Sequence, residues 1–445
     1  MAQLERLNCN NEEHKELERR FISELNNFIN KKVLIRGWVH KIIDLSHIVF
    51  VKLRDKSGVI QLVCDKDYIK DLRLENAIEV VGIVCSNEKA PDKIEVIVEK
   101  IEILGNTYYD KLPFEINSYK NKTALETQLD HRTISLRRPK IRAIFKVQSE
   151  IETAFRDYLK ERNFEQIHTA KIIDSSTEGG SEMFTVNYFD RRSFLAQSPQ
   201  FYKQMMVGAG FERVFEIGHA YRAELHNTWR HLNEYVSLDV EMGFIQDEFE
   251  LMNLEEGFIN YLFNHLNKVC KKELEMYQID LPNEVSIPRI TLEEAHQILL
   301  KEYNKKSPVG NIDAEGEVLI SKYVKEKYNS EFVFLTKYPV SKRPMYTMPD
   351  DKNKELTKSF DLIYDGLEIT TGGQRINDYK MLKENIIKFG LNPDDFHFYL
   401  EAFKYGMPPH GGFAIGLERL TMKILKLINI REATLVPRDM KRLTP

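Results

Sequence analysis

The sequence predicts an α+β protein, in which a small N-terminal β-barrel precedes a larger domain where helices flank an antiparallel sheet. Five strand-like runs follow one another between Lys32 and Leu104, with turn residues between them. From Arg213 onward, strand and helix patterns alternate without an internal repeat. At 445 residues, the chain is long enough for two or three domains and a large core.

Composition excludes several classes of protein. No apolar run is long enough to span a membrane, and residues 1–20 are polar and charged, unlike a secretory signal. Cys9, Cys64, Cys85 and Cys270 lack metal-ligand spacing, so we expect a reduced, cytoplasmic location. The net charge of -4 gives no general attraction to nucleic acid, so such a partner has to meet a local basic surface.

After an N-terminal helical tail at residues 1–30, residues 31–106 are expected to form the barrel. The strand-like runs are rich in β-branched residues, and they are Val33–Val39, Ile48–Leu53, Val59–Val63, Ala77–Val84 and Ile94–Val98. Five strands in such a span are typical of an OB-fold, which binds single-stranded nucleic acid on an aromatic and polar face. Phe50 and Gln61 could supply that face, although a core phenylalanine and a solvated glutamine explain the pattern alone better.

A polar connector is expected at residues 107–138, and residues 139–445 are expected to form the larger domain. A long amphipathic helix is predicted from Lys140 to Glu161. The later strands are predicted at Arg213–Ile217, Tyr235–Phe244, Phe332–Leu335, Ser359–Ile363 and Leu367–Thr370, and the later helices at Asp247–Lys271, Leu292–Lys301 and Tyr379–Phe389.

The most informative motif is Gly411–Leu420, in which a glycine-rich strand leads into a helix. Glycine in a strand lets a ligand approach closely, and Arg419 lies in the first turn of the helix. A glycine floor beside a fixed guanidinium suits a planar, anionic ligand such as a nucleoside triphosphate. A glycine bulge before an ordinary core helix explains this segment alone equally well.

A second stretch favours the same ligand. Two predicted strands enclose a polar loop, with Arg222 and Glu224 on one side of it and Arg230 and His231 on the other. The two arginines can reach different phosphates of one ligand, and Glu224 can accept a hydrogen bond from an adenine amino group. A solvated hairpin with surface ion pairs is the alternative.

The third stretch, Gly366–Asp378, combines oxygen ligands with an arginine. Glu368 and Thr371 flank a strand end and could hold a metal ion, while Arg375 could form a bidentate pair with a carboxylate. At two further loop ends, Glu178 suits a substrate ammonium, and Lys203 with Arg375 suits a side-chain carboxylate. Each of these stretches alone is also explained by a glycine turn with surface charges.

Together, these motifs resemble those of class II aminoacyl-tRNA synthetases, specifically the aspartyl-tRNA synthetases of the archaeal and eukaryotic type. Phe215–Glu241 is similar to class II motif 2, and Gly411–Leu420 is similar to motif 3. Gln197–Gln204, Gly372–Asp378 and Val436–Asp439 are similar to the aspartate subgroup. The resemblance implies an antiparallel catalytic sheet, an OB-fold for the anticodon and a homodimer.

The resemblance also implies a reaction. L-aspartate and ATP form aspartyl-adenylate, and aspartate is then transferred to the 3' end of tRNA-Asp, with tRNA-Asn as an open second substrate. Arg222 and Arg419 would be the catalytic residues, at the α-phosphate and the γ-phosphate end. Glu368 and Thr371 would hold Mg²⁺. Selectivity against asparagine would come from Lys203 and Arg375, because an amide leaves their charges uncompensated.

The same resemblance assigns the remaining binding residues. The set for ATP is Arg222, Ala223, Glu224, Arg230, His231, Leu232, Glu368, Gly416, Leu417, Glu418 and Arg419. The set for aspartate is Glu178, Gln200, Lys203, Arg222, Thr371 and Arg375. Phe50 and Gln61 match anticodon-contacting positions, which favours the nucleic-acid interpretation of both.

Some positions depart from the family pattern. Ala170 stands where motif 1 normally has a proline near the dimer interface, and Thr371 stands where serine is usual. His40 occupies a position where relatives strictly specific for tRNA-Asp tend to have tryptophan, whereas Lys89 resembles the strict type. The choice between strict and relaxed tRNA selection is therefore open, with a slight preference for relaxed selection.

Three other kinds of protein share parts of this pattern. An asparaginyl-tRNA synthetase shares the fold and most ATP residues, but is not expected to keep both Lys203 and Gln374–Asp378. A non-charging paralogue, either an amidotransferring asparagine synthetase or an RNA-binding regulator, is expected to lack the OB-fold or to have lost Arg222, Arg419 or Glu368. An RNA-binding protein of the OB type leaves most of the chain after residue 138 unexplained.

Overall fold

The computed structural model describes residues 17–45, 48–108, 111–117, 123–174, 183–225 and 228–445. The chain divides into two compact units, Met1–Thr123 and Ala124–Pro445. Among the described residues, no helix combines the length and the apolar character that crossing a membrane requires.

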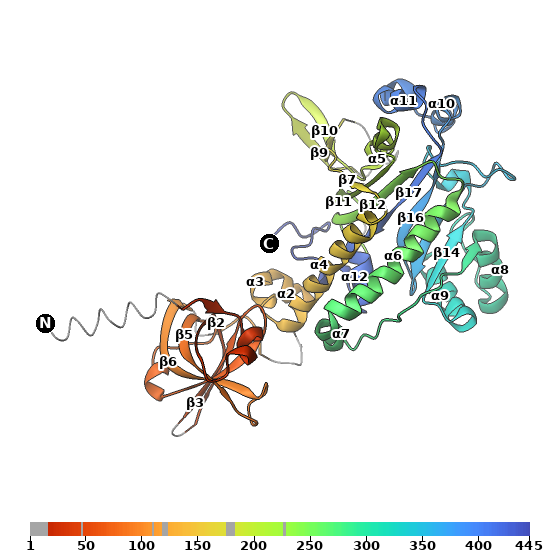
Figure 1. The fold of residues 1–445 in the computed structure, drawn as a ribbon. Coiled ribbons are helices and arrows are strands. Elements are labelled where there is room, and N and C mark those ends of the chain that lie inside the picture. Colours follow the sequence, from red (N-terminus) through yellow and green to blue (C-terminus); the bar gives the residue numbers. More distant parts are fainter. Residues whose placement is uncertain (1–16, 46–47, 109–110, 118–122, 175–182, 226–227) are drawn as a thin grey trace. The chain divides into compact units, whose positions relative to one another are not determined.

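The first unit is a closed barrel (Figure 1). Its five main strands are β2 (Lys32–Asp44), β3 (Val49–Arg54), β4 (Val59–Cys64), β5 (Ala77–Ser86) and β6 (Ile94–Gly105). They pair in the order β2-β3-β4-β6-β5, and β5 also pairs with β2, which closes the barrel. The β4–β6 pair is parallel, and the other pairs among these five strands are antiparallel. The predicted OB-fold is confirmed.

Apolar alternation places one side of each strand inside the barrel. Val49, Val51 and Leu53 of β3 are fully buried, whereas Phe50 and Lys52 between them are partly exposed. A turn follows β3, in which the Asp55 carboxylate accepts hydrogen bonds from the backbone amides of Ser57 and Gly58. A short 3₁₀-helix, η2 (Lys66–Ile69), lies between β4 and β5.

The described part of the expected N-terminal tail packs on the barrel. β1 (Arg19–Arg20) pairs with β2 in parallel, and the 3₁₀-helix η1 (Ile22–Phe28) follows it. Ile22 and Leu25 lie one helical turn apart, so both apolar side chains reach the barrel core. Residues 19–28 thus belong to the barrel rather than to a separate helical tail.

An eight-stranded sheet runs through the second unit. Its strands are, in spatial order, β13 (Arg289–Thr291), β14 (Phe332–Thr336), β15 (Ser359–Tyr364), β16 (Leu367–Arg375), β17 (His410–Gly416), β12 (Glu234–Gly243), β11 (Arg213–Tyr221) and β7 (Glu165–Gln166). Only the two outermost pairs, β13–β14 and β11–β7, are parallel. The predicted largely antiparallel sheet is confirmed.

Three helices, α4 (Pro139–Lys160), α6 (Glu248–Val269) and α12 (Leu417–Ile424), share one hydrophobic core with the sheet (Figure 1). Proline at the first position of α4 and the Asp247 side chain at the start of α6 favour these helix starts. The remaining α-helices are α2 (Leu125–Asp130), α3 (Arg132–Ser135), α5 (Gln200–Met206), α7 (Lys271–Tyr277), α8 (Leu292–Tyr303), α9 (Ala314–Tyr328), α10 (Tyr379–Lys388) and α11 (His397–Lys404). Helices α2 and α3 fall within the expected connector, yet they group with the second unit.

Candidate active site

The sheet face opposite the helical core carries polar side chains and small residues. On β12, Leu238 and Val240 belong to the core, so alternation turns Asp239 and Glu241 to the other face. On the adjacent β17, Gly412 lies on the same face. A Cβ atom at Gly412 would lie only 2.3 Å from Glu241 Oε2 and 2.0 Å from a backbone oxygen of β12, so glycine is required for this close approach.

A pocket lies on this face and collects residues from all three predicted stretches. It is lined by Arg222, Glu224, Arg230, His231, Leu232, Tyr235, Ser237, Glu368, Ile369, Thr371, Ala414, Gly416, Glu418, Arg419 and Ile430. Nine of the residues expected to bind ATP are among them. Of the other two, Ala223 does not line the pocket, and Leu417 is buried in the hydrophobic core behind the sheet.

Two arginines enter the pocket from different elements. The guanidinium of Arg222 lies 5.7 Å from the centre of the Tyr235 ring and 3.9 Å from Glu224 Oε1. Arg419, at the start of α12, donates to the backbone oxygen of Glu368 at 2.9 Å. Both guanidinium groups are therefore held at the pocket wall, where anionic ligand groups can pair with them.

The loop between β11 and β12 is held by a residue that sequence reasoning missed. Asn233 Nδ2 donates to the backbone oxygens of Arg222 and Glu224, at 2.7 and 3.0 Å. The backbone oxygen of Asn233 in turn accepts from the amide of Arg222 at 2.8 Å. These bonds hold the backbone that carries the Arg222 and Glu224 side chains. The signal was present, since an asparagine directly before a strand often bonds to nearby backbone groups.

Arg230 has a partner from a distant helix. Its Nη1 donates to Glu317 Oε2 of α9 at 2.9 Å. Burial raises the pKa of Glu317 to about 7, although Arg230 opposes that shift. The partner of Arg230 could not be assigned from the sequence, because the two residues are 87 positions apart.

Glu368 and Thr371 lie near each other in the first half of β16, which continues to Arg375, so they do not flank a strand end as predicted. Thr371 Oγ1 donates to Glu368 Oε1 at 3.3 Å, so both oxygens can contact one small cation. Desolvation, followed by the charge of Asp361, raises the pKa of the Glu368 carboxyl, and the charge of Arg419 is the strongest opposing effect. A cation would favour the ionised carboxylate in the same way, so the donor set fits the expected Mg²⁺.

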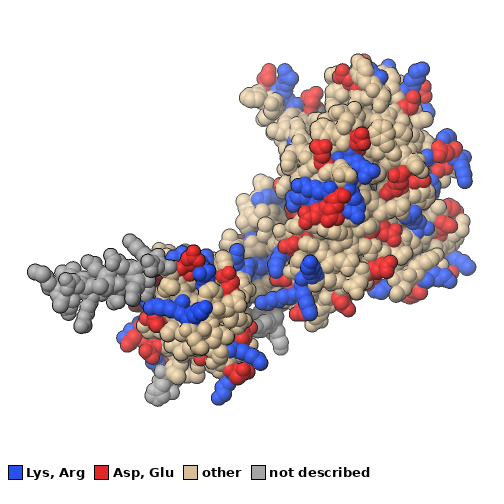
Figure 2. Space-filling view, in the orientation of Figure 1, with Lys and Arg blue, Asp and Glu red and all other residues tan. Residues whose placement is uncertain are grey.

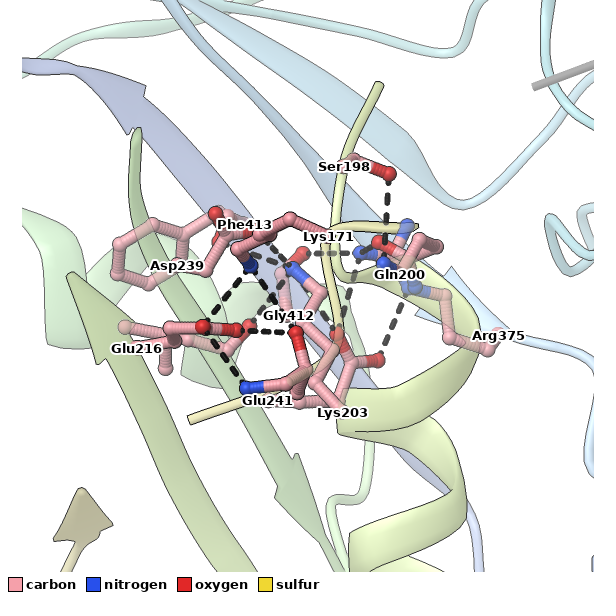
Figure 3. A network of polar contacts seen from close by, with 12 residues as sticks. Lys171, Ser198, Gln200, Lys203, Glu216, Asp239, Glu241, Arg375, Gly412 and Phe413 are labelled. Atoms are coloured by element: carbon pink, nitrogen blue, oxygen red, sulfur yellow. Dashed lines mark hydrogen bonds and ion pairs between the residues drawn. The ribbon is translucent and has the colours of Figure 1, made fainter. Parts of the chain in front are cut away.

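Lys203 and Arg375 lie deeper on the same face and are both nearly inaccessible, with 2% and 5% of their surface exposed. Lys203 Nζ donates to Asp239 Oδ1 at 2.9 Å and lies 3.4 Å from Glu241 Oε2. Arg375 Nε donates to Glu241 Oε1 at 3.0 Å. Figure 3 shows this network of two cations and two carboxylates.

The expectation that an amide would leave both cations uncompensated is therefore wrong. Asp239 and Glu241 already balance their charges, and sequence reasoning missed both carboxylates. Burial alone would raise the pKa of the Glu241 carboxyl. The charges of Arg375 and Lys203 outweigh this effect and lower that pKa, so the carboxyl stays ionised. The alternation of apolar and acidic residues along β12 could have shown that Asp239 and Glu241 share the face opposite the hydrophobic core.

Of the other residues expected to bind aspartate, only Gln200 contacts this charged cluster among the described residues. Gln200 Oε1 accepts from Arg375 Nη2 at 3.4 Å, while Gln200 Nε2 is buried without a hydrogen-bond partner among the described residues. Thr371 and Arg222 line the pocket described above instead of this cluster. Glu178 lies outside the described residues.

Ala170, which stands where motif 1 normally has a proline, is exposed. Its two neighbours, Thr169 and Lys171, both contact the Glu216 carboxylate of β11, at 2.7 and 2.9 Å (Figure 3 shows Lys171 and Glu216). This segment is thus fixed to the sheet without the usual proline.

The barrel presents the expected anticodon residues on its outer face. Phe50 and Gln61 are partly exposed on adjacent strands, so the interpretation of Phe50 as a core residue is wrong. Gln61 Nε2 donates to Glu95 at 3.0 Å. His40 lies on β2, and Lys89 is exposed in the loop between β5 and β6. On the side shown in Figure 2, basic and acidic residues are interspersed among the described residues instead of forming one large basic patch.

Comparisons with known proteins agree with this architecture. A family model described as "tRNA synthetases class II (D, K and N)" matches residues 124–440, and one described as "OB-fold nucleic acid binding domain" matches residues 33–104. The chain is 44% identical to the aspartate–tRNA(Asp/Asn) ligase of Aeropyrum pernix and 43% identical to the aspartate–tRNA(Asp) ligase of Pyrococcus furiosus, and each match covers 96% of this chain and 100% of the relative.

A solved structure extends the similarity to the fold of the whole chain. The asparaginyl-tRNA synthetase of Pyrococcus horikoshii, complexed with asparaginyl-adenylate, matches with a TM-score of 0.90 and 31% identity over 96% of this chain and 100% of that one. The first family model alone covers more than half of the sequence, and its range contains the complete pocket described above. The chain therefore belongs to the class II tRNA synthetases of the D, K and N group.

Proposed function

We propose that this protein is an aspartate–tRNA ligase, which activates L-aspartate with ATP and then transfers it to tRNA. The strongest support is the position of the pocket relative to the charged cluster, which consists of Lys203, Arg375, Asp239 and Glu241. The two lie next to each other along the same strands of the sheet. Ser237 of the pocket and Asp239 of the cluster are two positions apart on β12, which corresponds to about 7 Å. An amino acid bound at the cluster can thus place its α-carboxylate at a nucleotide in the pocket.

The proposed first step needs no general base. The α-carboxylate of aspartate is already ionised, so it attacks the α-phosphorus of ATP in line, and pyrophosphate leaves. Arg222 would contact the α-phosphate, and Arg419 would pair with the γ-phosphate end. Positioning and neutralisation of charge by these two residues would supply most of the acceleration. The terminal hydroxyl of tRNA then attacks the aspartyl-adenylate.

Glu368 and Thr371 are the proposed protein ligands of Mg²⁺, which would neutralise part of the triphosphate charge. Among the described residues, no group of three acidic, histidine or cysteine side chains could hold a metal ion by itself. The phosphate oxygens of ATP would therefore complete the coordination. Threonine replaces the usual serine without loss of the hydroxyl ligand.

The charged cluster would favour a carboxylate through its hydrogen-bond donors and not through its net charge, which Asp239 and Glu241 balance. Lysine and arginine side chains carry hydrogen-bond donors and no acceptors. An aspartate side chain offers acceptors to both Lys203 and Arg375, whereas an asparagine side chain would place its amino group against one of these donors. The buried amide of Gln200 supplies a further donor at the same place.

The asparaginyl enzyme among the solved structures makes asparagine activation the second candidate. ATP–pyrophosphate exchange distinguishes the two, because it measures adenylate formation without tRNA. We expect exchange with aspartate and none above background with asparagine. Exchange that depends on asparagine alone would refute the proposed amino-acid specificity.

A homodimer and a cytoplasmic location are also proposed, on the basis of the family resemblance. Sedimentation velocity of the purified chain tests the first proposal, since a dimer would sediment at twice the chain mass of 52.3 kDa. A single species at the chain mass, throughout the micromolar range, would contradict it.

A further inference from the structure

Residues 430–442 connect the candidate active site to helices α2 and α3. This segment begins with the 3₁₀-helix η6 (Ile430–Ala433) and includes residues 436–439, a sequence motif that none of the proposed reaction steps uses. Its hydrogen bonds reach the loop between β11 and β12 on one side and the two helices on the other. Because that loop carries Arg222, these contacts bear on the position of a proposed catalytic residue.

The loop between β11 and β12 is attached to the segment at two points. The amide of Ile430 donates to the backbone oxygen of Trp229 at 2.8 Å, and the amide of Asn233 donates to the backbone oxygen of Arg438 at 2.9 Å. Arg438 also forms an antiparallel bridge with Glu234, the first residue of β12. The second half of the loop is therefore fixed to the segment.

The attachment at Asn233 extends to Arg222. The backbone oxygen of Asn233 accepts from the amide of Arg222 at 2.8 Å, and Asn233 Nδ2 donates to the backbone oxygen of Arg222 at 2.7 Å. Asn233 is itself held by the backbone of Arg438. The segment thus supports the backbone of Arg222 through a single intervening residue.

On the other side, Arg132 of α3 holds the segment by its backbone. Its guanidinium donates to the backbone oxygens of Thr434 at 2.6 Å, Leu435 at 2.7 Å and Glu432 at 3.4 Å. Only 3% of the Arg132 surface is exposed. Hydrogen bonds from a charged donor are stronger than those between neutral groups, so this buried guanidinium fixes the path of the chain at these residues.

Five charged residues join α2 to the end of the segment. Arg442 Nη2 lies 3.0 Å from Glu126 Oε2 and 2.7 Å from Asp130 Oδ1. Arg431 Nη1 lies 2.7 Å from Glu126 Oε1 and 3.6 Å from Asp439 Oδ2. Burial alone would raise the pKa of Glu126, but the hydrogen bonds from Arg442 and Arg431 lower it. The ionised carboxylate of Glu126 therefore links the two arginines.

This network is better suited to positioning than to stability. Glu126 and Asp130 have 58% and 59% of their side-chain surfaces exposed, and ion pairs with exposed carboxylates contribute little to the free energy of unfolding. Catalysis is far more sensitive to geometry, because a misplacement of about 1 Å can lower a rate about 100-fold. The loss of Arg442 should therefore affect the reaction at Arg222 more than the folding of the protein.

We propose that Arg442 and Arg132 are positioning residues for adenylate formation, which hold Arg222 at the α-phosphate of ATP through residues 430–442 and Asn233. The inference rests on the proposed function, which assigns Arg222 to that phosphate. It gives α2 and α3 a role in the reaction, although the residues that line the pocket all lie outside these helices.

ATP–pyrophosphate exchange of the full-length protein tests this role. Arg442→Met should lower kcat by about three- to tenfold, less than the loss expected for a full displacement of Arg222. The KM for aspartate should stay nearly unchanged, because Asp239 and Glu241, and not this segment, hold the Lys203 and Arg375 side chains. Arg442→Lys keeps a positive charge near the same carboxylates, so it should restore part of the lost kcat.

The matched control is Lys305→Met. Like Arg442, Lys305 pairs with two carboxylates, those of Asp313 and Glu315 at 3.0 and 2.6 Å, and its side chain is 13% exposed, compared with 11% for Arg442. Because none of these three partners lines the pocket or belongs to the segment, the substitution should change neither kcat nor KM. A loss of kcat in Lys305→Met as large as that in Arg442→Met would overturn the inference.

A double-mutant cycle shows whether Arg442 acts through Arg222. In the Arg222→Ala background no guanidinium remains to be positioned, so the addition of Arg442→Met should lower the residual kcat by less than about twofold. An equal loss in both backgrounds would reveal a general structural effect and would overturn the inference. An unchanged kcat in the single variant Arg442→Met would overturn it as well.

The outcomes separate this inference from the proposed function. Arg132→Met should also lower kcat, but it leaves three backbone oxygens without their donor, so the Arg442 cycle decides the question if this variant does not fold. A wild-type protein without aspartate-dependent exchange would refute the proposed function instead.

Discussion

Replacement of Arg375 by methionine is expected to produce two separable effects. Arg375 is buried, and its closest partner, Glu241, is completely inaccessible, so the substitution leaves a buried carboxylate with only Lys203 beside it. Removing one member of a buried ion pair typically destabilises a protein by about 3–5 kcal/mol. Thermal denaturation of Arg375→Met should show a loss of this size.

The second effect of Arg375→Met is a lower kcat/KM for aspartate. A hydrogen bond to a charged group contributes about 1.5–3 kcal/mol, so the loss of one such bond should lower kcat/KM for aspartate by about 10- to 150-fold. The KM for ATP should stay nearly unchanged, because Arg375 does not line the pocket proposed for ATP. ATP–pyrophosphate exchange, with each substrate varied in turn, measures both quantities.

The double variant Arg375→Met/Glu241→Gln separates the two effects. It leaves Lys203 paired with Asp239 at 2.9 Å and restores the balance of charge, so most of the lost stability should return. Activation of aspartate should remain impaired, because the donor to the substrate carboxylate is still missing. Recovery of both properties would show that Arg375 only compensates Glu241, and the proposed role in aspartate recognition would be refuted.

Three further substitutions test other parts of the molecule. Arg222→Ala should lower adenylate formation by about 10²–10³-fold, as expected for a group that stabilises developing charge, and should leave tRNA affinity nearly intact; normal exchange with weakened tRNA binding would contradict this assignment. Phe50→Ala should spare exchange but reduce tRNA charging, because stacking of a base on an aromatic ring contributes about 1–3 kcal/mol; equal losses in both reactions would identify Phe50 as structural. Burial raises the pKa of Glu255 to about 8; the nearby Thr370 hydroxyl opposes this shift, and the charge of Asp361 adds to it. The folded state then binds the proton of Glu255 more tightly than the unfolded state does. The contribution of this proton to the free energy of unfolding is therefore fully present below the ordinary pKa of glutamate and is lost as the pH rises through about 8. Glu255→Gln should therefore raise the melting temperature at pH 9 more than at pH 5, and parallel melting curves of variant and wild type across this range would argue against the shift.

Short-range patterns were sufficient to predict the barrel. The apolar positions of β3 alternate regularly, and Asp55 begins a turn that its own side chain stabilises, so both features depend on residues close in sequence. The glycine-rich strand before α12 and the polar loop before β12 were likewise recognisable, because their residue types are unusual for a hydrophobic core. These local signals led to the pocket residues Arg222 and Arg419.

The missed features depend on contacts between residues distant in sequence. Lys203 and Asp239 are 36 positions apart, and Arg375 and Glu241 are 134 apart, so no local pattern shows that they neutralise one another. The β2–β3 pairing is also irregular between Val39 and Lys41, where the distant Glu75 amide donates to the backbone oxygen of Val39. Residues 1–30 were assigned to a tail because residues 1–20 are polar and charged, yet the barrel core buries both Ile22 and Leu25.

The most direct test of the proposed function is aminoacylation of purified tRNA-Asp and tRNA-Asn transcripts, each supplied separately with labelled aspartate and labelled asparagine. A ligase whose donor-only pair, Lys203 and Arg375, selects a carboxylate should attach aspartate and no asparagine. Transfer of asparagine to tRNA-Asn, without transfer of aspartate to either tRNA, would contradict the account.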